Sequence, residues 1–232
     1  NLMLIHGMFL LLSAVGITFG LYFSGSAWLG VFLLVDIIVV LVLLWNNKLK
    51  QEIRKRIAAE TKLKHLASHD PLTALPNRAL LMDRLNLAVA SHKRNNKCLA
   101  LMFIDLDGFK QVNDSFGHDV GDEVLKEFAT RLKENVRPSD VPCRQGGEEF
   151  VVIMPNTTEE EAQRVAERVR QNVCAEPFIV ENGKEQLSVT VSVGVSTTIN
   201  ANEDTDEVIK RADLALYQAK EAGRNRVVAA TL

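Results

Sequence analysis

The feature that most constrains this chain is an N-terminal stretch almost free of charge. Up to Trp45 the only formally charged side chain is Asp36, whereas charged residues are frequent from Lys48 onward. A helix that crosses the ~30 Å hydrocarbon core of a bilayer needs about 20 apolar residues. Residues 27–45 meet this requirement, and 2–23 form a second candidate beyond a short polar break. We therefore predict a transmembrane segment over 1–45, folded as a helical hairpin.

A basic cluster follows the apolar stretch directly. Its members are Lys48, Lys50, Arg54, Lys55 and Arg56. Lys and Arg next to a membrane span are typical of the cytoplasmic side. We therefore expect the rest of the chain to lie in the cytoplasm.

Apolar residues recur at helical intervals in the next segment, 46–68, and charged residues fill the positions between them. The apolar positions are Leu49, Ile53, Ile57, Leu63 and Leu66. This spacing predicts a linker helix with one apolar face. Such a helix is either solvated along its length or paired with a second chain in a parallel coiled coil. The segment is too short for periodicity to decide between the two.

The remaining residues, 69–232, form a domain in which helices and strands alternate. We expect helices over 78–93, 119–136, 158–175 and 204–222, and strands over 98–106, 141–145, 150–154 and 226–230. Asn182-Gly183 predicts a hairpin within 178–196, and the alternation from Leu187 to Val195 supports its second strand. This order is typical of an α+β fold in which helices flank a central, mostly antiparallel sheet.

The charge balance limits the partners. The net charge is −2, which indicates no nucleic-acid partner. A domain of this composition that handles phosphate groups must therefore use a few placed cations or metal ions.

Two short acidic motifs are the candidates for chemistry. Asp105 and Asp107 lie two residues apart at the end of a predicted buried strand, where alternate residues share a face. Gly146-Gly147-Glu148-Glu149 forms a turn between two predicted strands, and its glycines permit close backbone approach. Carboxylates gathered at one end of a sheet can hold Mg²⁺. Either motif alone is equally consistent with solvated acidic residues.

Together with their surroundings, these motifs resemble the GGDEF domains of diguanylate cyclases over 69–232. The signature runs from Arg144 to Phe150, with Glu148 in its third position, which makes it the GGEEF variant. Further matching motifs follow in order: Asp70-Pro71-Leu72-Thr73, Asn77-Arg78, 105–110, Asn113-Asp114, Gly117-His118, Gly121-Asp122, Ser192-Val193-Gly194, Ala212-Asp213, Leu216-Tyr217, Ala219-Lys220 and Gly223-Arg224-Asn225.

The resemblance implies a palm-like cyclase fold and an activity. Two GTP molecules would condense to cyclic di-GMP with release of two pyrophosphates. Asp105, the backbone carbonyl of Leu106, and Glu148 would bind two Mg²⁺ ions per active site, or Mn²⁺ in their place. The catalytic residues would be Glu148, Glu149 and Lys110, with either glutamate assisting deprotonation.

The resemblance also implies a substrate site, formed by Gly108, Phe109, Asn113, Asp122, Lys220 and Arg224. Asn113 and Asp122 would read guanine, whose pairing edge offers two adjacent N–H donors to a carboxylate. Adenine presents an acceptor there, which favours GTP over ATP. Lys220 and Arg224 lie four residues apart on the last predicted helix, hence on one face, and would hold phosphates.

An inhibitory product site is implied by Arg137 and Asp140, which match the family's RxxD motif, with Arg168 as a further partner. Arg offers a fork for phosphate or a guanine edge, and Asp accepts guanine N–H donors. Taken alone, an Arg and an Asp three apart are more often a surface ion pair.

The symmetric product requires two GTP-bearing chains in apposition, hence a homodimer. The linker helix and membrane segments would then set how often the two sites meet, in a multi-pass protein of the bacterial inner membrane. The alternative is a catalytically silent receptor domain that binds GTP or cyclic di-GMP. The intact Asp105 and Glu148 favour the enzyme. A cyclase that closes a ring within one nucleotide fits the guanine readers less well.

Overall fold

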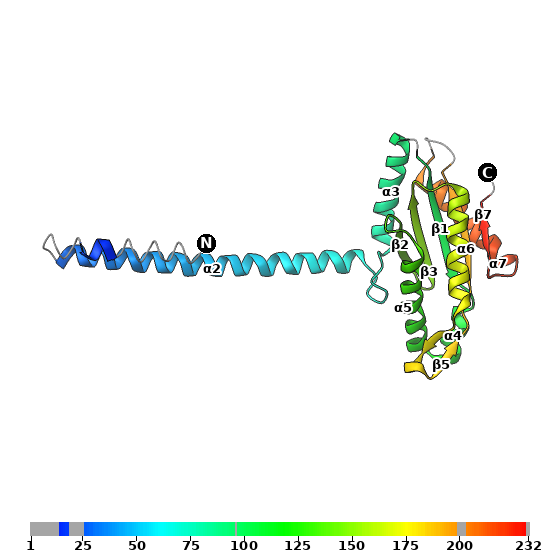
Figure 1. Cartoon of the computed structure of the whole chain (residues 1–232), viewed down its shortest axis with the longest axis horizontal. Helices are drawn as coiled ribbons and strands as arrows, with labels where there is room; N and C mark the ends of the chain where they lie inside the picture. The colour runs from blue at the N-terminus through cyan, green and yellow to red at the C-terminus, as the bar shows by residue number, and fades with distance from the viewer. Residues whose placement is uncertain (1–13, 19–25, 96, 199–202, 231–232) are drawn as a thin grey trace. The chain divides into compact units, whose positions relative to one another are not determined.

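The structure is a computed structural model that describes residues 14–18, 26–95, 97–198 and 203–230 (Figure 1). The chain divides into two compact units, Asn1–Leu63 and Lys64–Leu232. The helices are α2 (Ser26–Ser68), α3 (Arg78–Asn95), α4 (Phe109–Phe116), α5 (His118–Asn135), α6 (Glu159–Ala175), the 3-10 turn η1 (Glu181–Gly183) and α7 (Thr205–Glu221). The strands are β1 (Leu99–Leu106), β2 (Val141–Gly146), β3 (Glu149–Pro155), β4 (Phe178–Val180), β5 (Glu185–Leu187), β6 (Val191–Thr197) and β7 (Val227–Ala229).

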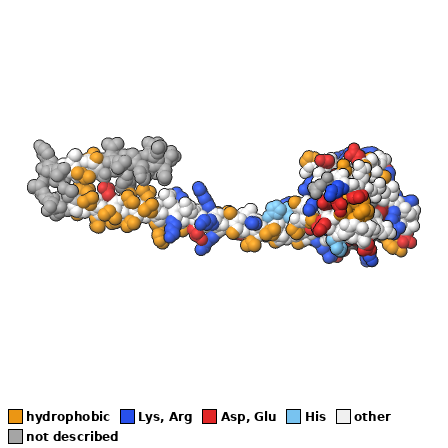
Figure 2. All heavy atoms as spheres, turned by 90° about the horizontal axis from the view of Figure 1, so that it is seen from below, with side chains coloured by type: hydrophobic (Ala, Val, Ile, Leu, Met, Phe, Trp, Pro, Cys, Tyr) orange, Lys and Arg blue, Asp and Glu red, His pale blue; other side chains and the backbone are white. Residues whose placement is uncertain are grey.

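Helix α2 covers both the predicted span and the predicted linker, so the two are one continuous helix of 43 residues, not separate elements. By length and composition its stretch from Gly30 onward could cross a membrane, with a mean hydropathy of 2.2 in the most apolar window. Figure 2 shows hydrophobic side chains along one part of this helix and Lys and Arg along the next. The apolar positions of the predicted linker, including Leu49 and Ile57, are exposed.

Residues 14–18 are helical and lie against α2. A side chain at Gly16 would overlap the ring of Phe32, so glycine allows this close approach. Most of 2–23 and the polar residues Ser24-Gly25 lie outside the described residues. The helical hairpin therefore stays a prediction.

The central sheet has five strands in the order β2-β3-β1-β6-β7. Strand β1 pairs antiparallel with β3 and β6, β2 pairs antiparallel with β3, and β6 pairs parallel with β7. The expectation of a sheet flanked by helices is thus confirmed. Three of the pairings are antiparallel, as expected, and the parallel pairing of β6 with β7 makes the sheet mixed. All eight residues of β1 are buried, because helices cover both faces of the sheet.

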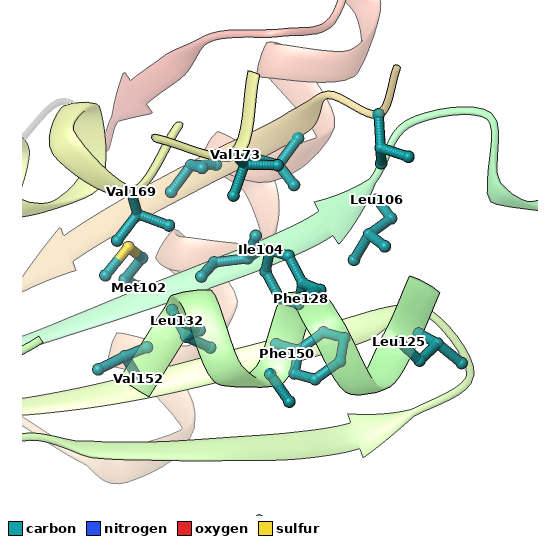
Figure 3. Close-up of a cluster of buried hydrophobic side chains, with 14 of the residues drawn as sticks. Met102, Ile104, Leu106, Leu125, Phe128, Leu132, Phe150, Val152, Val169 and Val173 are labelled. Atoms are coloured by element: carbon teal, nitrogen blue, oxygen red, sulfur yellow. The ribbon is translucent and has the colours of Figure 1, made fainter. Parts of the chain in front are cut away.

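The two faces of β1 serve two separate cores. Alternate residues from Ala100 to Leu106 face α5 and α6, as in Figure 3, where the Phe128 and Phe150 rings pack edge to face with centroids 4.6 Å apart. The other set, including Leu101 and Phe103, faces α3 and α7. Because the pattern has a period of two, Asp105 lies on the α3 and α7 face of the sheet.

Two elements differ from the prediction. Helix α4 was not predicted, because its eight residues are too few to show a clear apolar period. The predicted strand from Leu187 to Val195 is wrong: β5 ends at Leu187 in a small sheet with β4, and β6 begins at Val191 in the main sheet. An apolar, buried residue stands at every second position from Leu187 to Val195. The apolar alternation of the sequence therefore continues across the gap between β5 and β6 and conceals it.

Candidate active site

The carboxylates of the two acidic motifs meet at one end of the sheet. Asp105 lies opposite Glu149 in the antiparallel register of β1 and β3. The Leu106 N–H donates to the Glu148 carbonyl over 3.4 Å, which joins the strand end to the glycine turn. The side chain of Asp105 is almost fully buried, with the residue 7% exposed. The register thus brings Asp105, Leu106, Glu148 and Glu149 together.

The electrostatics of this cluster favour a bound cation. Burial raises the pKa of Asp105, the Lys220 ammonium 2.8 Å from its carboxylate lowers it, and Glu148 and Glu149 raise it further. The net pKa of Asp105 lies above its ordinary value. One lysine therefore does not offset the burial and the neighbouring carboxylates. A divalent cation would supply the missing positive charge.

The donors fit magnesium. Asp105 and Glu148 offer carboxylate oxygens and Leu106 offers a carbonyl oxygen, all of them hard ligands. Among the described residues, no three acidic, His or Cys side chains enclose a metal ion by themselves. Mg²⁺ in enzymes commonly takes one or two carboxylates and completes its shell with water and substrate phosphates. An open set of this kind suits a site in which metal and nucleotide bind together.

Asp107 has a different role from the one that its spacing suggested. Its carboxylate accepts hydrogen bonds from Thr190 Oγ1 at 2.7 Å, Ser192 Oγ at 2.6 Å and the Asn225 N–H at 3.0 Å. β1 ends at Leu106, so the strand rule no longer places Asp107 beside Asp105. Asp107 instead ties the start of β6 and the turn before β7 to the end of β1.

The predicted substrate-binding residues Gly108 and Phe109 lie where β1 leads into α4. Gly108 adopts a left-handed conformation (φ 70°, ψ 17°) and caps α4, and its carbonyl accepts the Gln111 N–H at 2.8 Å. The first N–H groups of a helix have no partner within it and attract anions. Phe109 is buried in the core and anchors the turn, while Lys110 is exposed.

Asn113 of α4 lies against Gly121 of α5, the residue that precedes Asp122 in the chain. A methyl group at Gly121 in α5 would overlap the Asn113 side chain of α4. Gly121 therefore lets the Asn113 amide lie against the first turns of α5. Gly117, with φ at 87°, makes the turn between the two helices. An amide donates and accepts hydrogen bonds and a carboxylate accepts them, so the two residue types suit recognition of the edge of a base.

Another glycine positions Lys220. A side chain at Gly194 of β6 would overlap the backbone of α7 at Ala212 and Leu216, so this helix packs directly on the strand. The packing directs Lys220 toward Asp105. The prediction that Arg224 shares a helix face with Lys220 is wrong. Helix α7 ends at Glu221, and Arg224 lies in the following turn with φ at 60°.

Comparison with known proteins agrees with this arrangement. Residues 67–226 match the family described as "Diguanylate cyclase, GGDEF domain". The chain belongs to the GGDEF family. The response regulator PleD of Caulobacter vibrioides is 50% identical over 163 residues, which make up 70% of this chain but only 36% of PleD. The chain thus spans little more than a third of that relative's length.

Two solved structures are also similar. The coiled coil and GGDEF domain of DgcB from Caulobacter crescentus, in complex with c-di-GMP, has a TM-score of 0.74 and 31% identity and covers 78% of this chain and 95% of its own. The active GGEEF domain of a diguanylate cyclase from Vibrio cholerae has a TM-score of 0.62 and 36% identity, over 67% of this chain and 97% of its own.

The turn at Gly146 to Glu149, which we call the GGDEF turn, is held in place by residues for which the sequence analysis predicted no role. Arg144 donates through Nε and Nη2 to the Gly147 carbonyl at 3.0 and 2.8 Å, and through Nη1 to Asp70 at 2.9 Å. Asp70 also accepts the N–H and hydroxyl of Thr73. Burial alone would raise the pKa of Asp70, but the bonds from Thr73 and Arg144 hold it below its ordinary value. Asp70, Thr73 and Arg144 all belong to the motifs that match the family. Membership in these motifs was the one sequence signal that they have a role.

The same loop contacts the end of α2. Asn77 donates through its side-chain amide to the Ala67 carbonyl at 2.9 Å and accepts the Leu80 N–H at 3.1 Å, which caps α3. The Asn77 N–H donates to the Ser68 carbonyl. The loop 70–77 thus connects the last turn of α2 to the GGDEF turn.

The predicted product-site residues gather between the end of α5, the start of β2 and α6. Asp140 is 7% exposed and its carboxylate accepts the Arg137 N–H at 2.9 Å. The Arg137 guanidinium lies 3.7 Å from Glu161 of α6, and both side chains are partly exposed. Arg168 of α6 donates to the Asn135 carbonyl at 2.7 Å.

Proposed function

We propose that this protein is a diguanylate cyclase that condenses two GTP molecules into cyclic di-GMP with release of two pyrophosphates. The observation that carries the proposal is the register that sets buried Asp105 opposite Glu149 and beside Glu148 at the sheet end. A buried carboxylate cluster with hard oxygen donors suits metal-assisted phosphoryl transfer. Membership of the GGDEF family supports the same activity.

The residues around the site divide the work of the reaction. Asn113 and Asp122 orient guanine, and the start of α4 with Lys110 holds phosphates. Asp105, the Leu106 carbonyl and Glu148 would hold Mg²⁺, which would supply positive charge for the phosphates and for the attacking 3′-hydroxyl. Glu148 or Glu149 receives the proton of that hydroxyl. Lys220, whose ammonium lies 2.8 Å from the Asp105 carboxylate, is close enough to the site to contact a phosphate of the leaving group.

Each chain supplies one such set of residues, so the two-fold symmetric product requires two chains. The exposed apolar face of α2, which includes Leu49, Ile53 and Leu63, suits pairing with a second chain. We include in the proposal that the apolar part of α2 anchors the dimer in a membrane and leaves the catalytic domain in the cytoplasm. Deleting 1–66 should then change the concentration dependence of activity, and an unchanged dependence would contradict this part.

We further propose that Arg137, Asp140 and Arg168 bind cyclic di-GMP and inhibit the enzyme. Asp140 is held by its own turn, while Arg137 offers a partly exposed guanidinium for guanine or phosphate. Binding would exchange the weak Arg137–Glu161 pair for contacts with the product. Arg137→Ala should abolish tight product binding and leave initial rates unchanged. Inhibition that survives in this variant would place the product site elsewhere.

The activity itself is tested by incubating the full chain, purified in mild detergent, with GTP and Mg²⁺. The proposal predicts cyclic di-GMP by mass spectrometry, with two pyrophosphates for each product molecule, and no product from ATP. Unchanged GTP in the presence of a folded dimer would contradict it. Nucleotide binding without turnover would support the receptor alternative.

A further inference from the structure

Two consecutive residues with left-handed backbones follow the end of α7. After Gly223, Arg224 and Asn225 have φ values of 60° and 43°. Glycine adopts this conformation freely and asparagine tolerates it, but arginine seldom does. A strained backbone of this kind persists only where the surrounding structure holds it. The turn 223–225 therefore depends on contacts with other elements.

One such contact ties the turn to the end of the sheet that carries Asp105. The Asn225 N–H donates to the Asp107 carboxylate at 3.0 Å, and Asp107 directly follows Leu106 of the site. The Arg224 side chain is exposed, and no hydrogen bond or ion pair joins its guanidinium to another described residue. The backbone of the turn therefore sets where the Arg224 side chain starts and in which direction it leaves the chain.

Arg170 of α6 makes the second contact that holds the turn. Its Nη1 donates to the side-chain oxygen of Asn225 at 2.7 Å, across 55 residues of sequence. Nε and Nη2 of the same guanidinium donate to the two carboxylate oxygens of Glu167, at 2.9 and 2.6 Å. Two parallel bonds to one carboxylate fix the plane of a guanidinium. Glu167 therefore orients the remaining nitrogen of Arg170 toward Asn225.

We propose that Arg170 is a positioning residue for GTP binding: through Asn225 it holds the turn from which Arg224 reaches a phosphate of the substrate. The inference rests on the proposed function, with Arg224 as the phosphate-binding residue that its motif predicts. Asn225 is held at two points, by Arg170 at its side chain and by Asp107 at its backbone. With the first of these lost, Arg224 is free to leave its strained conformation and its place at the site.

The alternative is that Arg170 contributes to stability alone, and Arg131 of α5 is the matched control for it. Arg131 also bonds a glutamate of its own helix, Glu127, at 2.9 Å, and it also ties its helix to a distant loop. Its Nη1 and Nη2 donate to the carbonyls of Glu176 and Pro177 at 2.7 and 3.0 Å. The side chains of Arg131 and Arg170 are 13% and 19% exposed. Arg131→Met should therefore lower stability and leave GTP affinity unchanged.

Affinity is measured by calorimetry on the full chain in mild detergent, with Mg²⁺ and guanosine 5′-(α,β-methylene)triphosphate. This analogue cannot release pyrophosphate, so the reading does not depend on turnover. Arg224→Ala should raise the Kd about tenfold, because a charge-assisted hydrogen bond to phosphate is lost. Arg170→Met should raise the Kd by about threefold to tenfold, and the double variant should bind as Arg224→Ala does, since Arg170 acts through Arg224.

An unchanged Kd in Arg224→Ala or in folded Arg170→Met would overturn the inference. A double variant in which the two effects multiply would also overturn it, and so would an equal rise of the Kd in Arg131→Met. Asn225→Ala tests the same link from the side of the turn. It should raise the Kd as Arg170→Met does, and adding Arg170→Met to it should cause no further rise.

The positioning role and the proposed function fail separately in these measurements. The predicted set of Kd values, with no cyclic di-GMP formed from GTP by the parent, would refute the proposed activity alone. Cyclic di-GMP formation by the parent, with parent-like affinity in Arg170→Met, would refute the positioning role alone.

Discussion

Arg144 Nη1 donates a 2.9 Å hydrogen bond to the carboxylate of Asp70, 74 residues earlier in the chain. The same guanidinium donates twice to the Gly147 carbonyl in the turn that carries Glu148. Both partners of the ion pair are largely buried, with side chains 12% and 19% exposed. The position of the turn that carries Glu148 is therefore fixed by a residue of the loop that follows α2.

Removing this guanidinium should loosen the turn without unfolding the domain. Arg144→Ala should lower the free energy of unfolding by about 1–3 kcal/mol, because it leaves the Asp70 carboxylate without its ionic partner. Cyclic di-GMP formation should fall at least about tenfold, since small displacements of catalytic groups are costly. Arg56→Ala is the matched control: its pair with Glu52 is exposed and 3.8 Å long, so both measurements should stay unchanged. Equal effects of the two variants would contradict this role.

The Asp70 carboxyl should make stability depend on acid pH. Its pKa is lower in the folded than in the unfolded chain, so the folded state favours the ionised form. The resulting stability is present above the ordinary value of 3.8 and is lost as the pH falls through the lower, folded value. Urea unfolding at a series of acidic pH values should show a shallower loss for Asp70→Asn than for the parent. Parallel curves would show that Asp70 contributes no pH dependence.

Asp105 should behave in the opposite way. Burial raises its pKa, so ionised Asp105 costs folding free energy, and this cost appears as the pH rises through the folded pKa. In EDTA at neutral pH, Asp105→Asn should therefore unfold at a higher temperature than the parent, and the difference should disappear at acid pH. The same variant should be inactive, since an amide binds Mg²⁺ weakly. A lower melting temperature at neutral pH would show that the Lys220 pair outweighs burial.

Gly194→Ala should displace α7 and Lys220 together. The added methyl group would meet backbone atoms of Ala212 and Leu216, which cannot rotate away as a side chain could. We expect a loss of about 1–3 kcal/mol or more in stability, with lower activity in the folded fraction. Adding Leu216→Ala should not restore either property, because the obstruction is backbone. Recovery in the double variant would mean that side-chain crowding is the cause.

The sequence predicted the elements whose signals are local. The buried strand β1 is a continuous apolar run, and α6 opens with a capping box in which Thr158 and Glu161 exchange hydrogen bonds, as their spacing indicated. The glycine turn and Asp105 were placed correctly at strand ends, because motif and apolar pattern agreed there.

The features that escaped prediction depend on contacts between distant segments. In the sequence Asp107 resembles a metal ligand. In the structure its carboxylate accepts hydrogen bonds from the Ser192 hydroxyl and the Asn225 N–H. Arg144 and Asp70 are separated by four elements, α3, β1, α4 and α5, and show no periodic relation. The end of α7 was predicted to within one residue, but Arg224 was wrongly placed on the face of this helix, although it lies beyond Gly223 in a left-handed turn.

The most direct test of the account compares three variants of one side chain. Pyrophosphate release and cyclic di-GMP formation from GTP and Mg²⁺ are measured for the full chain with Glu148→Asp, Glu148→Gln and Glu148→Ala. The account predicts activity in Glu148→Asp, which keeps a carboxylate, and a loss of about 100-fold or more in the other two, whose folds should be intact. Comparable turnover in Glu148→Gln would show that no metal-binding carboxylate is needed at this position, and would contradict the proposed site.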